Sequence, residues 1–347
     1  MTRGAETNPP NRFERLRVET DEDAHFDPDG PPPLPRTRFL RDESKSILSE
    51  NTAGDLSFEH SLNPYRGCEH GCAYCYARPY HEYLGFSAGL DFETNVVVKH
   101  EAPALLEKAL GARGYLPKKL SLSGVTDCYQ PVERQLRVTR GCLEVLARCR
   151  HPVVMITKNF LITRDIDLLS ELARHQAVAI YISITTLDKD LAGELEPRAS
   201  RPRARLEAIR RLREAGIPAG VAVAPVIPGL NDHEIPAILE AAAEANAGFA
   251  TWSMVRLPGA VSTVFSEWLD RHHPLKKEKI LNRIRETHAG KLNDSEPGRR
   301  MRGQGPMAAQ IRALFDTTCR RLGLATTTPE VSAVSFRRPD GPQLGLF

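Results

Sequence analysis

The sequence predicts an α/β protein in which six parallel β-strands alternate with helices. The apolar runs at 153–157, 178–185 and 218–226 are continuous and rich in β-branched residues, as strands buried on both faces are. Helical patterns separate these runs, which is the order of right-handed βαβ units. After about residue 260 the pattern is helical only. We therefore predict an open, partial (β/α)6 barrel with a helical C-terminal extension.

The elements follow from these patterns in chain order. We expect the six strands at 56–62, 119–125, 153–157, 178–185, 218–226 and 249–255, and a short extra strand at 96–98. We expect the helices of the barrel at 102–110, 135–150, 166–175, 202–215 and 233–245, and three more at 261–271, 275–287 and 307–322. Gly216 follows the helix at 202–215, where a glycine commonly ends a helix.

Composition divides the 347 residues into four parts. Residues 1–45 are rich in proline and charge, so we expect a disordered or surface-hugging arm. The barrel would occupy 46–258, the helical extension 259–325 and a flexible tail 326–347. The formal net charge of +3 allows a nucleic-acid partner without requiring one.

The sequence favours a cytoplasmic protein without a membrane partner. The first 15 residues contain no apolar segment typical of a signal peptide. We also find no apolar run of the length that crosses a bilayer. Thiols stay reduced in the cytosol, which weighs against disulfides among the seven cysteines.

Three of the cysteines, Cys68, Cys72 and Cys75, lie in one glycine-bearing segment with the spacing Cys-x3-Cys-x2-Cys. Thiolates are the ligands of iron–sulfur clusters, and three of them leave one iron of a 4Fe–4S cluster without a protein ligand. An open metal position is where a substrate or cofactor binds. The alternatives are a structural zinc site completed by His70 or His81, and disulfides.

Segment 63–78 resembles the signature of the radical S-adenosylmethionine (SAM) superfamily, Cys-x3-Cys-x-aromatic-Cys, with Tyr74 at the aromatic position. The whole segment is similar to one subgroup, the spore-photoproduct-lyase-like proteins, also called DNA repair photolyases. The resemblance covers about residues 40–330 and implies a radical SAM partial barrel. It also implies a 4Fe–4S cluster on the three cysteines, SAM bound near Tyr74 through its amino and carboxylate groups, and an external electron donor.

Polar residues close several predicted strands, at the edge where barrels of this kind collect functional groups. Ser123, Thr126 and Asp127 end the second strand, and we expect them to contact SAM, although the family's usual Gly-Gly-Glu is not present. Turn capping is the alternative role for such residues. Lys158 ends the third strand, where its ammonium would pair with the SAM carboxylate. Ser183 on the fourth strand is a candidate for the ribose hydroxyls.

Cys128 and Tyr129 lie beside these expected SAM contacts, and both side chains can form radicals. We predict that one of them relays a hydrogen atom to or from substrate, with burial of Cys128 in the core as the alternative. Val125 stands where the resemblance places the hydrogen-donating cysteine of true spore photoproduct lyases, which counts against repair of the spore thymine dimer. The remaining cysteines, at 142, 149 and 319, are expected in the core.

Two basic segments are candidate phosphate sites. The first is an arginine run at positions 198, 201, 203 and 205, and the second is the glycine-rich loop at 298–306. Solvated surface is the alternative for both.

The sequence thus favours a radical SAM enzyme that reductively cleaves SAM and acts on nucleic acid, as a DNA-repair-like lyase. The alternatives are radical SAM modification of RNA, protein or a metabolite, and a non-enzymatic metal-binding module, since a fold does not fix a substrate.

The C-terminal peptide supplies a further hint of DNA. Its residues Gln343, Leu344, Leu346 and Phe347 match the short peptide by which bacterial repair proteins dock on the DNA sliding clamp. Burial of its two apolar anchors, Leu346 and Phe347, would contribute about 1.5–3 kcal/mol each. We predict the clamp as a partner through residues 343–347, with back-folding onto the barrel as the alternative.

Overall fold

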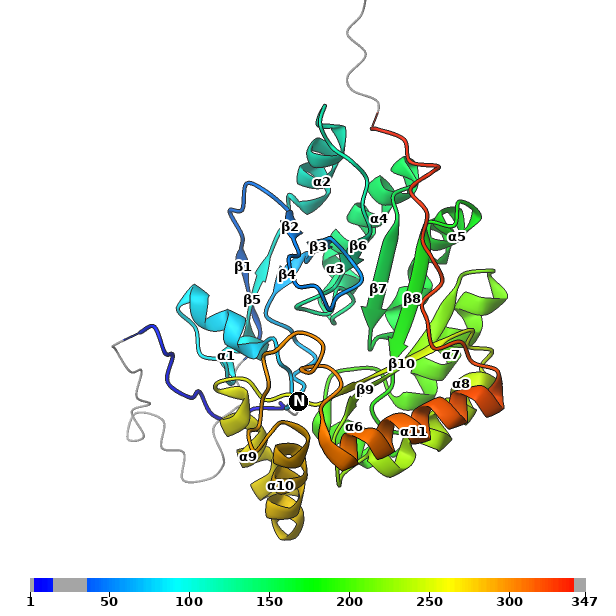
Figure 1. Cartoon of the computed structure of the whole chain (residues 1–347). Helices are drawn as coiled ribbons and strands as arrows, with labels where there is room; N and C mark the ends of the chain where they lie inside the picture. Colours follow the sequence, from blue (N-terminus) through cyan, green and yellow to red (C-terminus); the bar gives the residue numbers. More distant parts are fainter. Residues whose placement is uncertain (1–2, 15–35, 340–347) are drawn as a thin grey trace, which may run out of the picture.

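The computed structural model describes residues 3–14 and 36–339 (Figure 1). The C-terminal peptide that contains Gln343 and Phe347 lies outside the described residues, as does the proline-rich stretch at 31–35.

The main sheet has seven strands in the order β10-β9-β8-β7-β6-β3-β2. All neighbouring pairs from β3 to β10 are parallel, while β2 (Leu48–Glu50) pairs antiparallel with β3 at the edge. The six parallel strands are β3 (His60–Leu62), β6 (Leu120–Leu122), β7 (Val153–Thr157), β8 (Val178–Ser183), β9 (Ala219–Val226) and β10 (Ala250–Met254). This confirms the predicted α/β fold with an open partial barrel.

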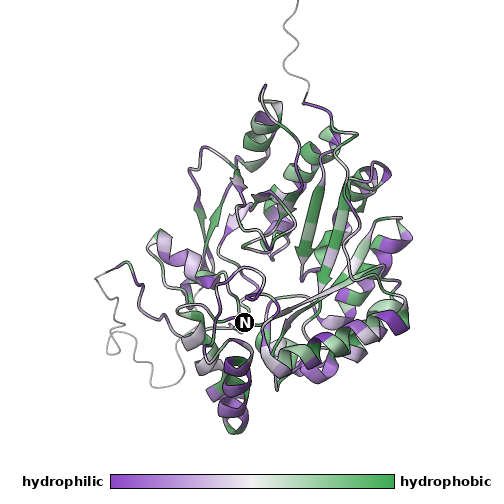
Figure 2. Ribbon diagram, in the orientation of Figure 1, coloured by the Kyte–Doolittle hydropathy of each residue, from purple (hydrophilic) through white to green (hydrophobic). Residues whose placement is uncertain are grey.

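Helices pack along the convex side of the sheet, and their apolar faces turn toward it (Figures 1 and 2). The barrel helices are α2 (Ala102–Gly111), α3 (Glu133–Leu136), α4 (Val138–Cys149), α5 (Ile166–Arg174), α6 (Lys189–Leu195), α7 (Pro202–Glu214) and α8 (Ile235–Glu244). One large apolar cluster joins these helices to the strands. The cluster contains Cys142, Cys149 and Cys319, the three cysteines that we expected in the core.

A second, three-stranded sheet has the order β1-β5-β4 and lies beside the main sheet. Its strands are β1 (Arg38–Arg41), β4 (Tyr65–Arg66) and β5 (Asn95–Val98), and the short helix α1 (Asp91–Thr94) precedes β5. The sequence predicted only the strand near 96–98. Strand β1 belongs to the expected arm at 1–45, yet it pairs in parallel with β5. Strand β1 is largely exposed, and its two apolar residues, Phe39 and Leu40, are adjacent and do not alternate with polar ones, which is why its pairing was missed.

Three helices follow the barrel, namely α9 (Val261–His272), α10 (Lys277–Thr287) and α11 (Gly305–Leu322). Trp268 and Phe265 of α9 are buried in a second apolar cluster that also contains Cys72 and Tyr74. Residues 326–339, expected as the start of a flexible tail, run along the barrel instead. There the amide of Ser332 donates to the carbonyl of Gln176 (2.8 Å), and that of Arg337 to the carbonyl of Cys149 (2.8 Å).

In the part of the chain that the structure describes, no helix combines the length and apolar character needed to cross a membrane.

Candidate functional site

The cysteine loop, residues 67–78, begins where β4 ends, and β3 with β4 carries it to the carboxyl-end edge of the main sheet. Gly67 and Gly71 adopt positive φ angles of 78° and 67°, which glycine tolerates without a Cβ clash. Cys68 and Cys72 are buried and Cys75 is half-buried. All three thiols are free, and the loop gathers them on one short stretch of chain.

The donor set fits the implied cluster. Burial raises the pKa of Cys68 and Cys72 well above the ordinary thiol value, and the charges of the neighbouring cysteines add to the effect. A bound iron cluster would supply the positive charge that favours thiolates. Across residues 3–14 and 36–339, no three His, Cys, Asp or Glu side chains converge as a single metal ion requires.

Of the two histidines considered as fourth zinc ligands, His70 has polar partners, whereas His81 packs against aromatic rings and its buried Nε2 has no hydrogen-bond partner among the described residues. Nδ1 of His70 lies 3.4 Å from a carboxylate oxygen of Asp127, and its Nε2 lies 3.2 Å from the amide nitrogen of Asn159. His81 stacks on Phe86, with ring centroids 5.1 Å apart. Its burial lowers its pKa to about 4. Both rings therefore support the loop.

The buried pair of Glu93 and Arg78 fixes the backbone of the loop. Both side chains are 0% exposed, and their charged atoms are 2.5 Å apart. The Arg78 guanidinium also donates to the carbonyl oxygen of Cys72 at 3.0 and 3.1 Å. From the N-terminal segment, the amides of Gly4 and Ala5 donate to the Glu93 carboxylate at 3.1 and 2.8 Å. Residues 3–14 thus strap the loop in place, a contact that nothing in the sequence of the arm indicated.

Asp127 joins the loop to the ends of β6 and β7. Its carboxylate accepts hydrogen bonds from the Thr157 hydroxyl (2.7 Å) and from the amides of Tyr129 (2.9 Å) and Lys158 (2.8 Å), and it pairs with His70. Burial alone would raise its pKa, but His70 and these donors together lower it to about 2. Four donors occupy the acceptor sites of this carboxylate, so Asp127 organises the turn and the loop, and its contact with SAM stays a prediction.

Ser123 and Thr126 also serve the turn after β6, which was the alternative interpretation. The Ser123 hydroxyl donates to the Thr126 carbonyl (2.6 Å) and accepts from the Cys128 amide (3.2 Å). The Thr126 hydroxyl donates to the Tyr65 carbonyl (3.0 Å). Ser123 has a φ of 84°, an unusual angle for a residue other than glycine. The turn places Gly124 and Val125 beside the cysteine loop.

Tyr74 is held by a buried network around Glu196. Its hydroxyl and that of Thr185 both donate to the Glu196 carboxylate, and the Arg205 guanidinium pairs with the same group. Burial acts to raise the pKa of Glu196, but Arg205 and Lys158 outweigh it and lower the pKa to about 2. The charged Glu196 therefore fixes the aromatic ring between Cys72 and Cys75.

Lys158 and Ser183 each keep a polar group available for a ligand near this network. The Lys158 ammonium lies 5.9 Å from the centroid of the Tyr74 ring. Within the described residues it forms no hydrogen bond or ion pair, so it can receive an anionic group. The buried Ser183 hydroxyl donates to the carbonyl of Ala224 (2.9 Å) and keeps lone pairs to accept a hydrogen bond.

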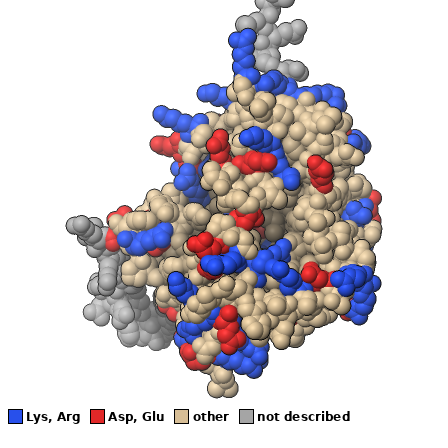
Figure 3. Space-filling model, in the orientation of Figure 1, with Lys and Arg blue, Asp and Glu red and all other residues tan. Residues whose placement is uncertain are grey.

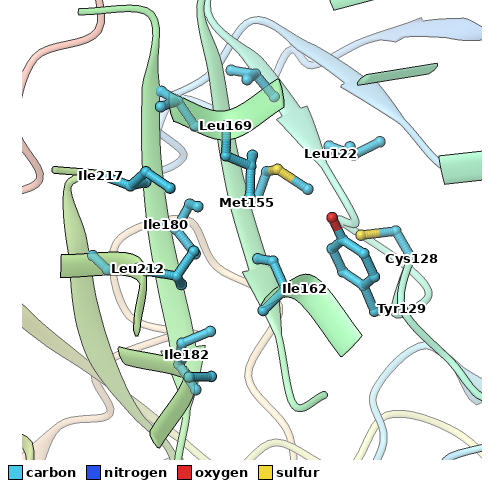
Figure 4. Packing of buried hydrophobic residues seen from close by; sticks show 14 of the residues in the cluster. Leu122, Cys128, Tyr129, Met155, Ile162, Leu169, Ile180, Ile182, Leu212 and Ile217 are labelled. Carbon is cyan, nitrogen blue, oxygen red and sulfur yellow. The ribbon is translucent and has the colours of Figure 1, made fainter. Parts of the chain in front are cut away.

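Cys128 and Tyr129 do not reach the site. Both are 0% exposed and belong to the core between β6, β7 and the helices, as Figure 4 shows. The Tyr129 hydroxyl donates to the buried carboxylate of Asp165 (3.1 Å). Burial in the core is the alternative that the sequence allowed for Cys128, and the hydrogen relay through either residue stays a prediction.

The arginine run does not form a phosphate site either. Arg205 is buried against Glu196, Arg198 pairs with Glu69 (2.7 Å), and Arg201 donates to a backbone carbonyl (2.9 Å). In the loop at 298–306, Arg300 pairs with Asp55 (2.6 Å). Basic and acidic side chains are interspersed on the face shown in Figure 3.

Comparisons with known proteins agree with this geometry. The model of the radical SAM superfamily matches residues 62–242. An uncharacterised protein of Mycobacterium tuberculosis is 36% identical over 247 residues, which is 70% of this chain and 72% of that protein. An uncharacterised protein of Methanocaldococcus jannaschii is 26% identical over 225 residues, 65% of this chain and 80% of that protein.

Two solved structures share the fold. Spore photoproduct lyase complexed with dinucleoside spore photoproduct superposes with a TM-score of 0.61 at 14% identity, over 82% of this chain and 79% of that one. A mutant of the lyase with bound AdoMet and dinucleoside spore photoproduct has a TM-score of 0.59 at 15% identity, over 82% and 78%. At this identity the likeness establishes the fold.

The support of the loop by Glu93 can be tested with Glu93→Gln. The change leaves the Arg78 charge buried without its partner, and breaking a buried pair costs about 3–5 kcal/mol. We expect a lower free energy of unfolding in denaturant titrations and less iron bound after anaerobic reconstitution. Glu101→Gln is the control, because its pair with Arg41 is exposed and such pairs contribute about 0–1 kcal/mol. Equal effects of the two changes would contradict the assigned role.

Proposed function

This chain belongs to the radical SAM superfamily, and we propose that it is a lyase-like enzyme of that family that acts on DNA. The observation that carries the proposal is the cysteine loop, three free thiols held beside Tyr74 at the carboxyl-end edge of the sheet. The family uses a 4Fe–4S cluster and SAM.

Different residues of this chain would have different roles at the site. Cys68, Cys72 and Cys75 would hold the cluster. When bound, the cluster and SAM supply radical chemistry through reductive cleavage of the SAM sulfonium, with the electron coming from an external donor. The Lys158 ammonium would pair with the SAM carboxylate. The apolar cluster around Cys72 and Tyr74 keeps water from this side of the loop.

Two arguments favour DNA over RNA, protein or a metabolite. The first is the fold shared with spore photoproduct lyase, a protein whose structure contains a dinucleoside photoproduct. The second is the C-terminal peptide with Gln343 and Phe347, which is similar to clamp-docking peptides and would deliver the enzyme to DNA. The two arguments are independent, since one rests on the barrel and the other on a segment outside the described residues.

Substitution of the cysteines tests the assignment of the cluster ligands. Wild-type protein should bind about four irons after anaerobic reconstitution, and after reduction with dithionite it should release 5′-deoxyadenosine from SAM. Cys72→Ala should lose most of the iron and all of this release. Cys128→Ala removes a thiol of similar burial from the core, so it should keep its iron. Zinc in place of iron in the wild-type protein, with no cluster after reconstitution, would contradict the assignment of a 4Fe–4S cluster.

Exchange of Lys158 tests the SAM site. A hydrogen bond to a charged group contributes about 1.5–3 kcal/mol, so Lys158→Ala should raise the dissociation constant of SAM about 10- to 100-fold. Isothermal titration of SAM into reconstituted protein measures this directly. Lys189→Ala, which removes an exposed lysine from helix α6, is the control. An unchanged dissociation constant in Lys158→Ala would refute the pairing.

The substrate class is tested with reduced enzyme and SAM. DNA oligonucleotides that carry defined base lesions are incubated anaerobically and analysed by mass spectrometry, with RNA of matching sequence in parallel. We expect lesion-dependent conversion of DNA that requires Cys72. Conversion of RNA, or of a peptide or metabolite pool, with DNA left intact would replace the proposed substrate.

A further inference from the structure

We propose that a cleft beside the cysteine loop binds an unpaired segment of nucleic acid by stacking its bases on exposed tyrosines that arginines flank. The cleft has a volume of about 230 Å³. Its walls include Arg12, Tyr76, Tyr80, Tyr83, Arg256 and Arg300, and we call it the aromatic–arginine cleft. This inference deepens the proposed function and rests on it, because it specifies the form of nucleic acid that the enzyme receives.

The aromatic side chains of the cleft are unusually open to solvent. Tyr80 is 55% exposed, Tyr83 67% and Tyr76 38%. The sequence places them at 76, 80 and 83, in and just before the 3-10 helix η2 (Arg78–Leu84) that follows the third cluster cysteine. Apolar rings exposed together in a concave surface mark an interaction site. Exposed aromatic faces that a chain does not use for its own core are the stacking platforms of single-strand binders.

Arginines already lie over these rings. The guanidinium of Arg256 is 4.3 Å from the centroid of the Tyr76 ring, and that of Arg12 is 5.3 Å from the centroid of Tyr83. Phe13 packs against Tyr83 in a tilted arrangement, with ring centroids 4.8 Å apart and an angle of 38° between the planes. A planar base stacked on the open face of a tyrosine would lie beside these guanidinium groups, as nucleic-acid-binding surfaces provide.

The charge of the cleft suits a polyanion. Arg12 pairs with Glu82 (3.2 Å) and Arg300 with Asp55 (2.6 Å). Arg256 has no acidic partner among residues 3–14 and 36–339, so its charge is available to a phosphate. Phosphate contacts of this kind position a strand, while stacking holds its bases.

The position of the cleft connects it to the interior of the barrel. A second cavity of about 370 Å³ lies against the strands, lined by Ile156, Ala222 and Thr251 among others. Asp55 lines this second cavity, and Arg300 lines the cleft, so their ion pair stands between the two. A strand stacked in the cleft would therefore place its next nucleotide at the Asp55–Arg300 pair, beside the second cavity.

Unpaired nucleic acid fits better than a duplex. The bases of a duplex are stacked on one another, so their faces are not available to Tyr80 and Tyr83. A cleft of about 230 Å³ is also below the range of pockets that enclose whole cofactors. It suits single flat rings that enter from outside.

Fluorescence anisotropy of the full-length, anaerobically reconstituted enzyme tests the proposal. The probes are fluorescein-labelled dT12 and the duplex of dT12 with dA12. We expect tighter binding of dT12 than of the duplex. Tyr80→Ala and Tyr83→Ala should each weaken dT12 binding about five- to a hundredfold, while Tyr80→Phe and Tyr83→Phe keep the ring and should bind within about twofold of wild type.

Arg256→Ala should weaken dT12 binding and reduce the slope of log affinity against log salt by about 0.7, as expected for one lost phosphate contact to a single strand. Arg320→Ala, which removes one exposed charge from helix α11, is the charge-matched control and should leave the slope unchanged. Iron content per chain reports whether each variant is folded.

Three results would overturn the inference: no binding of dT12 by the wild-type enzyme, tighter binding of the duplex, or equal effects of Arg256→Ala and Arg320→Ala. SAM cleavage measured on the same preparation distinguishes a failure of the cleft hypothesis from a failure of the proposed function. Cleavage of SAM without dT12 binding would contradict nucleic-acid binding by the cleft but not the enzyme class. Binding of dT12 without SAM cleavage would contradict the proposed function but not nucleic-acid binding by the cleft.

Discussion

Buried carboxylates hold the cysteine loop in place, and the rest of the site depends on them. A charged group is costly to bury unless other groups donate to it. Here the donors come from the cysteine loop and from distant segments together. The loop side chains and their carboxylate partners are Arg78 with Glu93, His70 with Asp127, and Tyr74 with Glu196. The residues between the cysteines are therefore fixed by electrostatics, and each carboxylate ties the loop to a different part of the barrel.

This arrangement explains how the cysteine loop can hold its shape before a cofactor binds. Burial raises the pKa of Cys68 and Cys72, which disfavours their thiolate forms until a metal supplies positive charge. The shape must come from the surroundings. Arg78 holds the carbonyl of Cys72, and the amides of Gly4 and Ala5 complete the shell of Glu93. An N-terminal segment far from the barrel in sequence is thus part of the cofactor site.

The strands and the cluster cysteines could be predicted from sequence because their signals are local. Val153–Thr157 is a continuous apolar run with one face buried and the other partly buried, and its predicted bounds agree with the structure. The supporting contacts were not predictable, because their partners lie far apart in sequence, as with Gly4 and Glu93, 89 residues apart. Ser123 is a second feature that could not be predicted from the sequence. Its positive φ turns Cys128 and Tyr129 toward the core, and no periodicity reveals such a turn.

The surroundings of Val125 bear on the chemistry that this barrel can support. Val125 packs with Cys68, Ala77 and Phe92 beside the cysteine loop, so this strand end does reach the site. Valine has no weak X–H bond to donate, and the thiol of Cys128 is turned into the core. Apart from the three cluster cysteines, all thiols of the described chain lie in the apolar core. The chain thus shares its fold with spore photoproduct lyase without placing a donor thiol at this strand end. Because a fold hosts several chemistries, this counts against repair of the spore thymine dimer by this chain.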